Sequence, residues 1–498
     1  MNGKNGSGVH GSGVYGSGTD GTGHVVVIGA GIAGLAAAHR LLGRGARVTV
    51  LEAAEGIGGK LQVAEMAGVR IDLGAESMLA RRPEAVGLAR EVGLADRLTP
   101  PGTATASIWT RGALRPMPKG HVMGVPGTAA ALSGVLSDEG LARIEREADL
   151  PRTEVGDDVG VGEYVADRLG REVVDRLVEP LLGGVYAGDA YRISMRSAVP
   201  QLFQAARTHA SLTEAVRGIQ AKAAANQHTG PVFMGIEGGV GTLAQAVAAS
   251  VTAQGGEILT RTPATELRRA GDGGWRVTAG DRVLHADAVV VAVPAPAAAA
   301  LLAAEAPAAA AELRAVEYAS MALVTLAYHR ADVTLPDGSG FLVPPVDGRT
   351  IKASTFSSQK WRWMAEDNPD VITLRTSVGR YGETEILQHE DAHLVDVSRR
   401  DLGAATGLDA TPLDTRVVRW TDGLPQYPVG HHARVARIRE HVAALPGLAV
   451  CGAQYDGVGI PACVASAHAA VDQLDGDSRA VRELSANPVQ SLHGGAGE

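Results

Sequence analysis

The sequence has few cysteines, few aromatic residues and no excess of basic charge. Its 498 residues include two cysteines, Cys451 and Cys463, too few for a disulfide framework or a structural zinc site. This scarcity favours a reducing compartment. Lys and Arg number 46 against 55 Asp and Glu, which gives a formal net charge of −9 and no basic footprint for nucleic acid. We therefore predict a cytoplasmic protein that binds no nucleic acid, and any anionic ligand must be bound by a local cationic pocket.

A long apolar run is also lacking. The longest uncharged apolar stretch, Ala288 to Ala304, is shorter than the roughly 20 residues of a membrane span and contains Pro294 and Pro296. We interpret it as a buried strand, Ala288 to Val293, that leads into a helix. The N-terminus has no signal region with a lysine followed by apolar residues. The sequence thus predicts no transmembrane segment and no export.

A complete βαβ unit begins at His24. The β-branched run His24–Ile28 is typical of a parallel strand buried on both faces, and it leads into the glycine pattern Gly29–Gly34 and a helix. A second strand, Arg47–Leu51, ends at Glu52. Such glycines permit a tight turn, close approach of the backbone to a pyrophosphate and close packing of helix on strand. Glu52 stands where a carboxylate can accept both hydroxyl protons of an adenosine ribose.

The glycine pattern alone is weak evidence, and its context makes it specific. It follows a strand, opens a helix and is followed by an acid at the end of the next strand, which also argues against the 2′-phosphate of NADP. A second glycine pair and a cation, Gly58-Gly59-Lys60, come soon after Glu52. This extension resembles the motif of glutathione-reductase-like and amine-oxidase-like flavoproteins and favours FAD over NAD. The alternative interpretation is an ordinary glycine turn.

The middle of the chain is predicted to be mainly helical. After a strand around Val69–Leu73, a helical stretch begins at Pro83 and runs, with many Gly and Pro breaks, to about residue 225. Its strongest helix carries an apolar stripe at four-residue spacing, formed by Val165, Leu169, Val173, Leu177 and Leu181. We interpret the stripe as core, the alternative being a face that lies on a membrane surface.

The domain prediction divides the chain into alternating segments. The nucleotide-binding part is predicted from residues 24–75, 230–305 and 436–475, since strands return at Phe233, Glu257, Trp275, Ala288 and Leu448. Residues 76–110 and 306–435 are predicted as an α+β substrate domain, and 111–229 as a helical domain. Residues 1–23, rich in Gly and Ser, and 476–498 are predicted as flexible tails.

Several motifs together resemble the oxygen-dependent protoporphyrinogen oxidase family, and within it the soluble bacterial coproporphyrinogen III oxidases. The resemblance covers roughly residues 24–475. Beyond VVVIGAGIAGLAAAHRL with EAAEGIGGK, the motifs are DLGAESMLARRP, LRPMPKG, LVEPLLGGVYAGD, GIEGGVGTL, RWTDGLPQYPVGH and CGAQYDGVGIPACV. The family commonly has Asp after the Pro of GVGIP, where this chain has Ala462.

The resemblance implies a fold, a cofactor and an activity. The fold is α/β, an FAD-binding Rossmann-like domain built from three segments, with an α+β substrate domain and a helical insertion. The activity is FAD-dependent oxidation of coproporphyrinogen III to coproporphyrin III, with dioxygen as acceptor and hydrogen peroxide as product. The implied partners are the tetrapyrrole, dioxygen and, transiently, a ferrochelatase. Flavin N5 receives the hydride, so no residue is predicted as catalytic and no metal is expected.

The resemblance also assigns roles to residues. It implies pyrophosphate contacts at Gly29, Ala30, Gly31, Ile32, Ala33 and Gly34, ribose contacts at Glu52 with Ala53 beside it, and Lys60 on the ribityl-phosphate side. Gly74, Ala75, Glu76 and Ser77 are expected along the isoalloxazine, Ala264 at the adenine, and Trp420 at the flavin. Val458, Gly459 and Ile460 are expected to present amides near flavin N1 and O2, where reduction leaves negative charge that a helix dipole stabilises.

A substrate with several propionates needs cations around its pocket. Arginine binds carboxylates bidentately, and the family places a cationic substrate contact near Arg81 and Arg82, which are therefore the predicted substrate-binding residues. Arg115, Lys119 and Lys352 are weaker candidates. The two cysteines are interpreted as buried small residues rather than covalent flavin anchors.

Three other functions stay open. Protoporphyrinogen IX oxidase differs only in substrate. An amine oxidase or carotenoid-type desaturase is disfavoured because four Phe and nine Tyr leave little for an aromatic cage. A non-catalytic flavoprotein scaffold in haem synthesis would consume no oxygen when given a porphyrinogen.

Overall fold

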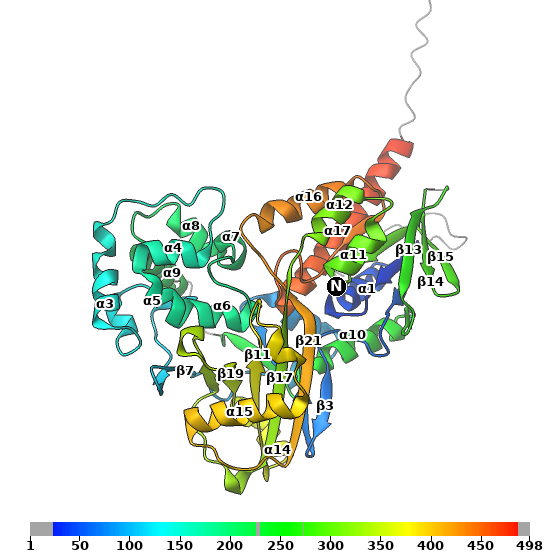
Figure 1. Cartoon of the computed structure of the whole chain (residues 1–498). Helices are drawn as coiled ribbons and strands as arrows, with labels where there is room; N and C mark the ends of the chain where they lie inside the picture. Colours follow the sequence, from blue (N-terminus) through cyan, green and yellow to red (C-terminus); the bar gives the residue numbers. More distant parts are fainter. Residues whose placement is uncertain (1–22, 226–229, 272, 487–498) are drawn as a thin grey trace, which may run out of the picture.

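The computed structural model describes residues 23–225, 230–271 and 273–486 (Figure 1). The Gly- and Ser-rich tail predicted over 1–23 lies outside the described residues apart from Gly23, as does the predicted C-terminal tail beyond residue 486. In Figure 1 a helical region lies to the left, the parallel sheet with its helices to the right, and a large antiparallel sheet below.

The nucleotide-binding part is organised around a parallel sheet of five strands in the order β12-β2-β1-β16-β22. Their bounds are Glu257–Leu259 (β12), Arg47–Leu51 (β2), His24–Ile28 (β1), Ala288–Val291 (β16) and Leu448–Val450 (β22). The β-branched runs in β1 and β16 are fully buried because helices cover both faces of the sheet. Three stretches of chain far apart in the sequence therefore share one sheet.

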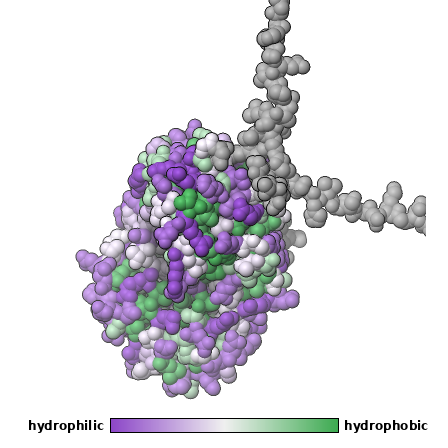
Figure 2. All heavy atoms as spheres, turned by 90° about the vertical axis from the view of Figure 1, so that its right-hand side faces the viewer, coloured by the Kyte–Doolittle hydropathy of each residue, from purple (hydrophilic) through white to green (hydrophobic). Residues whose placement is uncertain are grey.

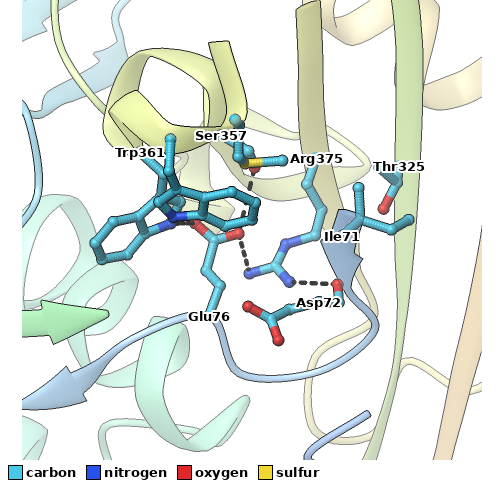
Figure 3. A pocket seen from close by; sticks show the side chains of 9 residues that line it. Ile71, Asp72, Glu76, Thr325, Ser357, Trp361 and Arg375 are labelled. Atoms are coloured by element: carbon cyan, nitrogen blue, oxygen red, sulfur yellow. Dashed lines mark hydrogen bonds and ion pairs between the residues drawn. The ribbon is translucent and has the colours of Figure 1, made fainter. Parts of the chain in front are cut away.

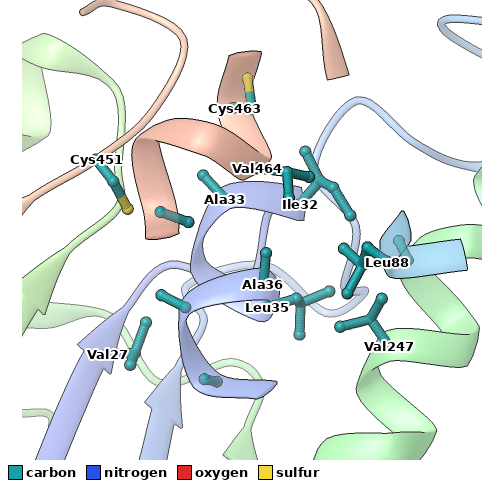
Figure 4. Packing of buried hydrophobic residues seen from close by; sticks show 14 of the residues in the cluster. Val27, Ile32, Ala33, Leu35, Ala36, Leu88, Val247, Cys451, Cys463 and Val464 are labelled. Atoms are coloured by element: carbon teal, nitrogen blue, oxygen red, sulfur yellow. The ribbon is translucent and has the colours of Figure 1, made fainter. Parts of the chain in front are cut away.

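Helices α1 (Ile32–Gly43), α10 (Gly241–Ala253) and α17 (Ile460–Ala486) cover one face of this sheet, and Figure 4 shows Leu35 of α1 packing near Val247 and Leu88. Helices α11 (Ala295–Leu302), α12 (Pro307–Arg314) and α16 (His431–Ala443) cover the other face. The prediction of a flexible tail from residue 476 is wrong for its first part, since α17 continues to Ala486. Beside the sheet stands an antiparallel sheet of β13 (Ala264–Arg269), β14 (Trp275–Ala279) and β15 (Arg282–Ala286).

The second large sheet has seven strands in the order β21-β17-β20-β19-β18-β7-β8. Their bounds are Asp414–Pro425 (β21), Tyr318–His329 (β17), Val371–Val378 (β20), Ile351–Thr355 (β19), Gly340–Leu342 (β18), Ser107–Thr110 (β7) and Ala113–Pro116 (β8). Helix α15 (Asp391–Thr406) packs on one face, where Leu394 and Leu402 join Val324 and Leu326 of β17 in one apolar cluster. The alternate residues of β17 point to the opposite face.

The helical region contains α3 (Asp138–Glu145), α4 (Val161–Leu169), α5 (Arg171–Val173), α6 (Glu179–Tyr186), α7 (Met195–Ala198), α8 (Pro200–Ala206) and α9 (Leu212–Ala225). The apolar stripe predicted along its strongest helix is core, as expected, with Val165, Leu169, Val173 and Leu177 buried. The single long helix is wrong, because Gly170, at φ +94°, breaks it and a π-helical turn follows over Val174–Val178.

The prediction of a mainly helical region, with many Gly and Pro breaks, from Pro83 to about residue 225 is wrong for part of its first half. Helix α2 (Pro83–Glu91) forms, and it is followed by the short strands β6 (Leu98–Thr99), β7, β8, β9 (His121–Val122) and β10 (Val125–Pro126). Strand β7 pairs with β18, more than 200 residues away, and β6 pairs with β11 (Phe233–Ile236), which also pairs with β5 (Met78–Leu79). These strands are too short for a period of their own, so pairing with distant partners decides their structure. Strand β8 therefore belongs to the seven-stranded sheet, although the predicted domain boundary at residue 111 placed it in the helical domain.

The remaining elements near the site are β3 (Val63–Met66), β4 (Val69–Asp72), α13 (Ser357–Lys360) and α14 (Arg362–Asp367). Within the described ranges, no helix is long and apolar enough to cross a membrane. Figure 2, which shows the right-hand side of Figure 1, has apolar patches interrupted by polar residues.

Candidate functional site

Three glycines shape the loop between β1 and α1. Gly29 has φ +106°, and a Cβ there would lie 2.6 Å from the carbonyl oxygen of Ala292. A Cβ on Gly34 would lie 1.9 Å from the carbonyl oxygen of Gly29, so the helix can pack on the loop only without a side chain. Around a Cβ on Gly31 no atom lies within 4 Å. Two glycines thus serve packing, and the third leaves open space at the start of α1.

The open space at Gly31 lies at the positive end of α1. Gly31 is the N-cap residue, no side chain caps the helix, and its first turn contains no acidic residue. The N–H of Gly58 donates to the carbonyl of Ala30 at 2.8 Å, and a Cβ on Gly59 would lie 3.4 Å from Cα of Gly31. Both glycine segments therefore border the same place, where bare amides and the helix dipole suit a pyrophosphate. Ile32 and Ala33 point into the core, so their backbone alone faces this place.

Glu52 reaches the glycine loop, as the ribose prediction requires. Its carboxylate accepts the N–H of Ala30 at 2.7 Å and that of Ala54 at 2.8 Å, and the side chain is half-buried. The N–H of Thr262 donates to the carbonyl of Glu52 at 2.8 Å, which brings the chain leading to Ala264 beside it. Ala53 is exposed. The predicted ribose and adenine residues are thus neighbours across more than 200 residues of sequence.

Lys60, Gly74 and Trp420 meet next to this loop. A Cβ on Gly74 would lie 2.0 Å from the carbonyl oxygen of Lys60 and 3.5 Å from the Trp420 ring. The indole N–H of Trp420 donates to the carbonyl of Leu73 at 3.0 Å. Lys60 is accessible to water, yet desolvation by the surrounding protein lowers the pKa of its ammonium. We call the place bordered by Gly31, Lys60, Gly74 and Trp420 the recess.

The first turn of α17 lies near Lys60. Burial raises the pKa of the Cys463 thiol in this turn to about 11, and the positive charges of Lys60 and Arg82 act in the opposite direction. The N–H of Cys463 closes the turn on the carbonyl of Gly459 at 3.0 Å. Val458, Gly459 and Ile460 therefore stand at a second helix N-terminus beside the same recess.

The carboxylate of Glu76 is buried and has three partners from β20, α13 and the residue after α13. It is 2.9 Å from Nη2 of Arg375 and 3.1 Å from the indole nitrogen of Trp361 (Figure 3). It is also 3.2 Å from Nζ of Lys360. Burial alone would raise the pKa of Glu76, but Arg375 and Lys360 bring it down to about 2. The pocket around it has room for about one water molecule, far too little for a tetrapyrrole.

Glu76 therefore anchors the segment Gly74–Ser77, and the contact of this segment with the isoalloxazine stays a prediction. Arg375 also donates to the carbonyl of Gly74 at 2.6 Å, and Lys360 lies 3.5 Å from the Ser77 hydroxyl. Ala75, between these anchored positions, is exposed. Arg375 was not predicted from the sequence, where its only signal is a single arginine within the apolar strand VITLRTSV.

The predicted substrate-binding arginines differ in their surroundings. Arg81 is exposed, whereas Arg82 pairs with Glu84 at 2.8 Å at the start of α2. The effect of Arg82 on the pKa of Cys463 places Arg82 near α17. Propionate binding by either arginine stays a prediction. Among the weaker candidates, Arg115 is half-buried, Lys119 is exposed and Lys352 is buried.

Two other predictions concern the cysteines and a metal site. Cys451 and Cys463 are free and buried, and burial raises the pKa of both thiols, which are therefore protonated at neutral pH. Within the described ranges, no group of three or more His, Cys, Asp or Glu residues could hold a metal ion.

The glycine loop, the ribose acid, a second helix N-terminus and a tryptophan at one recess fit FAD and define the class as an FAD-dependent oxidoreductase. Comparison with known proteins identifies the family. The model of the flavin-containing amine oxidoreductases matches residues 32–475, and the chain belongs to this family.

Similar proteins narrow the class further. The chain is 39% identical over 455 residues to the coproporphyrinogen III oxidase of Mycobacterium tuberculosis (strain ATCC 25618 / H37Rv), covering 90% of this chain and 96% of that protein. It is 30% identical to the protoporphyrinogen oxidase of Bos taurus, covering 91% and 98%. A crystal structure from Exiguobacterium sp. 255-15 superposes with a TM-score of 0.81 at 32% identity, covering 91% and 99%. These similarities confirm the porphyrinogen oxidase resemblance and the use of FAD.

Proposed function

We propose that this protein oxidises coproporphyrinogen III to coproporphyrin III, with dioxygen as electron acceptor and hydrogen peroxide as product, in haem biosynthesis. The observation that carries the proposal is the match at 39% identity, over nine-tenths of the chain, to a coproporphyrinogen III oxidase. The recess supports it, because a porphyrinogen oxidation needs a bound flavin and no metal or nucleophile.

The residues of the chain hold and orient the cofactor. FAD supplies the hydride acceptor for the bridge carbons of the porphyrinogen. The N-terminus of α1 and the open face of Gly31 receive the pyrophosphate, and Glu52 binds the ribose. Trp420 and Arg375 fix the backbone carbonyls of Leu73 and Gly74 beside the ring system. With FAD bound, the N-terminus of α17 would favour negative charge near Val458, Gly459 and Ile460.

Pyrrole N–H protons are lost to solvent, so the chemistry requires no strong protein base. This agrees with the side chains at the recess. Lys60 and Trp420 bind and orient the cofactor, and Glu76 is already paired with two cations. Arg81 and Arg82 contribute positive charge for propionates at the side of α2.

We also propose that the protein works in the cytoplasm. Two buried, free thiols suit a reducing cytoplasm. Transient contact with a ferrochelatase, which would receive the product for metal insertion, stays a prediction.

Protoporphyrinogen IX is the second candidate substrate, favoured by the 30% identity to the bovine protoporphyrinogen oxidase. The two are separated by giving the purified yellow protein each porphyrinogen in parallel while recording oxygen uptake and porphyrin fluorescence. We expect a higher kcat/KM for coproporphyrinogen III. Equal turnover would remove the choice between substrates, and no oxygen uptake with either would refute the enzyme and favour a scaffold.

A further inference from the structure

Lys352 of β19 is a buried cation without a carboxylate partner. The residue is 6% exposed, and its Nζ lies 3.8 Å from Sδ of Met321. Among the described residues, no Asp or Glu oxygen comes within 4.0 Å of this ammonium. Lysine is almost never buried unless it is paired, because an isolated charge in the protein interior is costly. The position therefore calls for an anion that the chain itself does not provide.

The ammonium lies on the sheet face that carries Trp420, a predicted flavin contact. The register between β19 and β20 shifts between Ile351 and Ala353, so Lys352 is the extra residue of a bulge, a device that re-aims a side chain. Met321, which it touches, stands directly opposite Trp420 in the pairing of β17 with β21. Directly opposite residues share a face, with Cβ atoms about 5 Å apart. Helix α15 covers the other face.

Trp420 links this face to the recess, since its indole donates to Leu73 beside Gly74. Lys352 is thus one side chain, Met321, away from the tryptophan that borders the predicted isoalloxazine. A ligand stacked over the ring system would extend toward this lysine.

The charged groups around Lys352 have other partners. Arg380 and Glu383, from the segment after β20, pair with each other at 3.5 Å. Glu179 of α6 accepts the N–H of Ala190 at 2.8 Å. Burial lowers the pKa of Lys352 to about 7, helped by the charge of Arg380 and opposed by Glu383 and Glu179. The charge of the lysine is therefore only partly compensated.

We propose that Lys352 is the counter-ion of one propionate of the porphyrinogen and selects for the substrate that carries a propionate there. The inference rests on the proposed function. Coproporphyrinogen III has four propionates, whereas protoporphyrinogen IX has vinyl groups at two of these positions. A vinyl group placed against a buried ammonium leaves the charge uncompensated, which makes Lys352 a specificity-determining residue.

The test compares K352M with the wild type on both porphyrinogens. Met has a similar length and no charge, and it suits a site next to Met321. We expect kcat/KM for coproporphyrinogen III to fall about 10- to 100-fold, as for loss of a charged hydrogen-bond partner. The kcat/KM of K352M for protoporphyrinogen IX should equal or exceed that of the wild type. K222M, on the exposed side of α9, is the matched control and should change neither value.

Two further readouts separate ligand binding from a structural role. K352R keeps the charge and should retain most of the preference for coproporphyrinogen III. In the wild type, kcat/KM for coproporphyrinogen III should fall as pH rises above about 7, because only the protonated lysine pairs with a carboxylate. K352M should lack this decline. Glu179, Glu383 and Arg380 are present in both proteins, so their titration does not create the difference.

The inference is overturned if K352M keeps the wild-type ratio between the two substrates, or if it loses both activities equally. Failure of the proposed function would look different, because the wild type would then oxidise neither porphyrinogen. In that case quenching of coproporphyrin III fluorescence still tests the lysine. Equal affinity of wild type and K352M for this tetracarboxylate would refute its role.

Discussion

Replacing Gly31 by alanine is expected to weaken FAD binding while leaving the apoprotein stable. Gly31 has φ −70° and ψ 172°, values that alanine adopts without strain, and no atom lies within 4 Å of the added Cβ. Loss of a glycine N-cap costs the apoprotein less than about 1 kcal/mol. The new methyl group instead occupies the space proposed for the pyrophosphate. Overpacking of this kind costs about 1–3 kcal/mol, a 5- to 150-fold rise in the Kd for FAD.

Gly34 provides the contrast within the same motif. An alanine Cβ there would lie 1.9 Å from the carbonyl oxygen of Gly29, and both groups belong to the backbone, so no side-chain movement relieves the clash. G34A should therefore lower the free energy of unfolding of the apoprotein itself by about 3 kcal/mol or more. Gly43, at the last turn of α1 with no atom within 4 Å of its Cβ, is the control. G43A should be neutral or stabilise by up to about 1 kcal/mol.

The assay has two parts. Urea unfolding of flavin-free protein gives the stability of each variant, and quenching of flavin fluorescence on titration gives the Kd for FAD. A G31A protein that binds FAD as tightly as the wild type would refute the placement of the pyrophosphate. A G34A apoprotein as stable as the wild type would refute the packing argument.

Two further predictions concern the anchors of the recess. E76Q removes the charge that pairs with Arg375 and Lys360. The pKa of Glu76 in the folded protein is about 2, below the ordinary 4.5. The pairing therefore stabilises the fold above pH 4.5, and this stabilisation is lost as pH falls toward 2. The lowered pKa corresponds to about 3 kcal/mol of folding stability at neutral pH. Wild-type stability in urea should decline between pH 4.5 and 2 more steeply than that of E76Q, and parallel acid profiles would contradict this. W420F removes the indole donor to the carbonyl of Leu73. It should lower the free energy of unfolding by about 1 kcal/mol and shift the visible absorption of the flavin. W275F loses a similar bond to Pro446, remote from the recess, so an equal spectral shift in both variants would contradict the position of Trp420.

The nucleotide-binding unit was predictable because its signals are local. The run His24–Ile28, the glycines and the acid at Glu52 each follow from steric and packing demands within a few residues, and the structure has β1, α1 and β2 in these places. The split of the sheet among distant segments followed from the same kind of apolar run at Ala288 and Leu448.

The short strands between residues 98 and 126 were missed because nothing in their own sequence has a strand period. Strand β7 extends the antiparallel sheet only through its pairing with β18, and β6 only through β11. The ion pairs of Glu76 were not predicted for a related reason. Its cationic partners Lys360 and Arg375 come from an element and a strand almost 300 residues away.

The sequence by itself determined the class of cofactor and the family, because a dinucleotide fold imposes glycine and acid at fixed local spacings that can be read along the chain. Tertiary structure alone decided which charges are compensated. Glu76 is neutralised by two cations, Arg82 by Glu84, and Lys352 by no carboxylate in the described chain. The physical reason is that the energy of a charge depends on its burial and its neighbours in space, which spacing along the sequence does not specify.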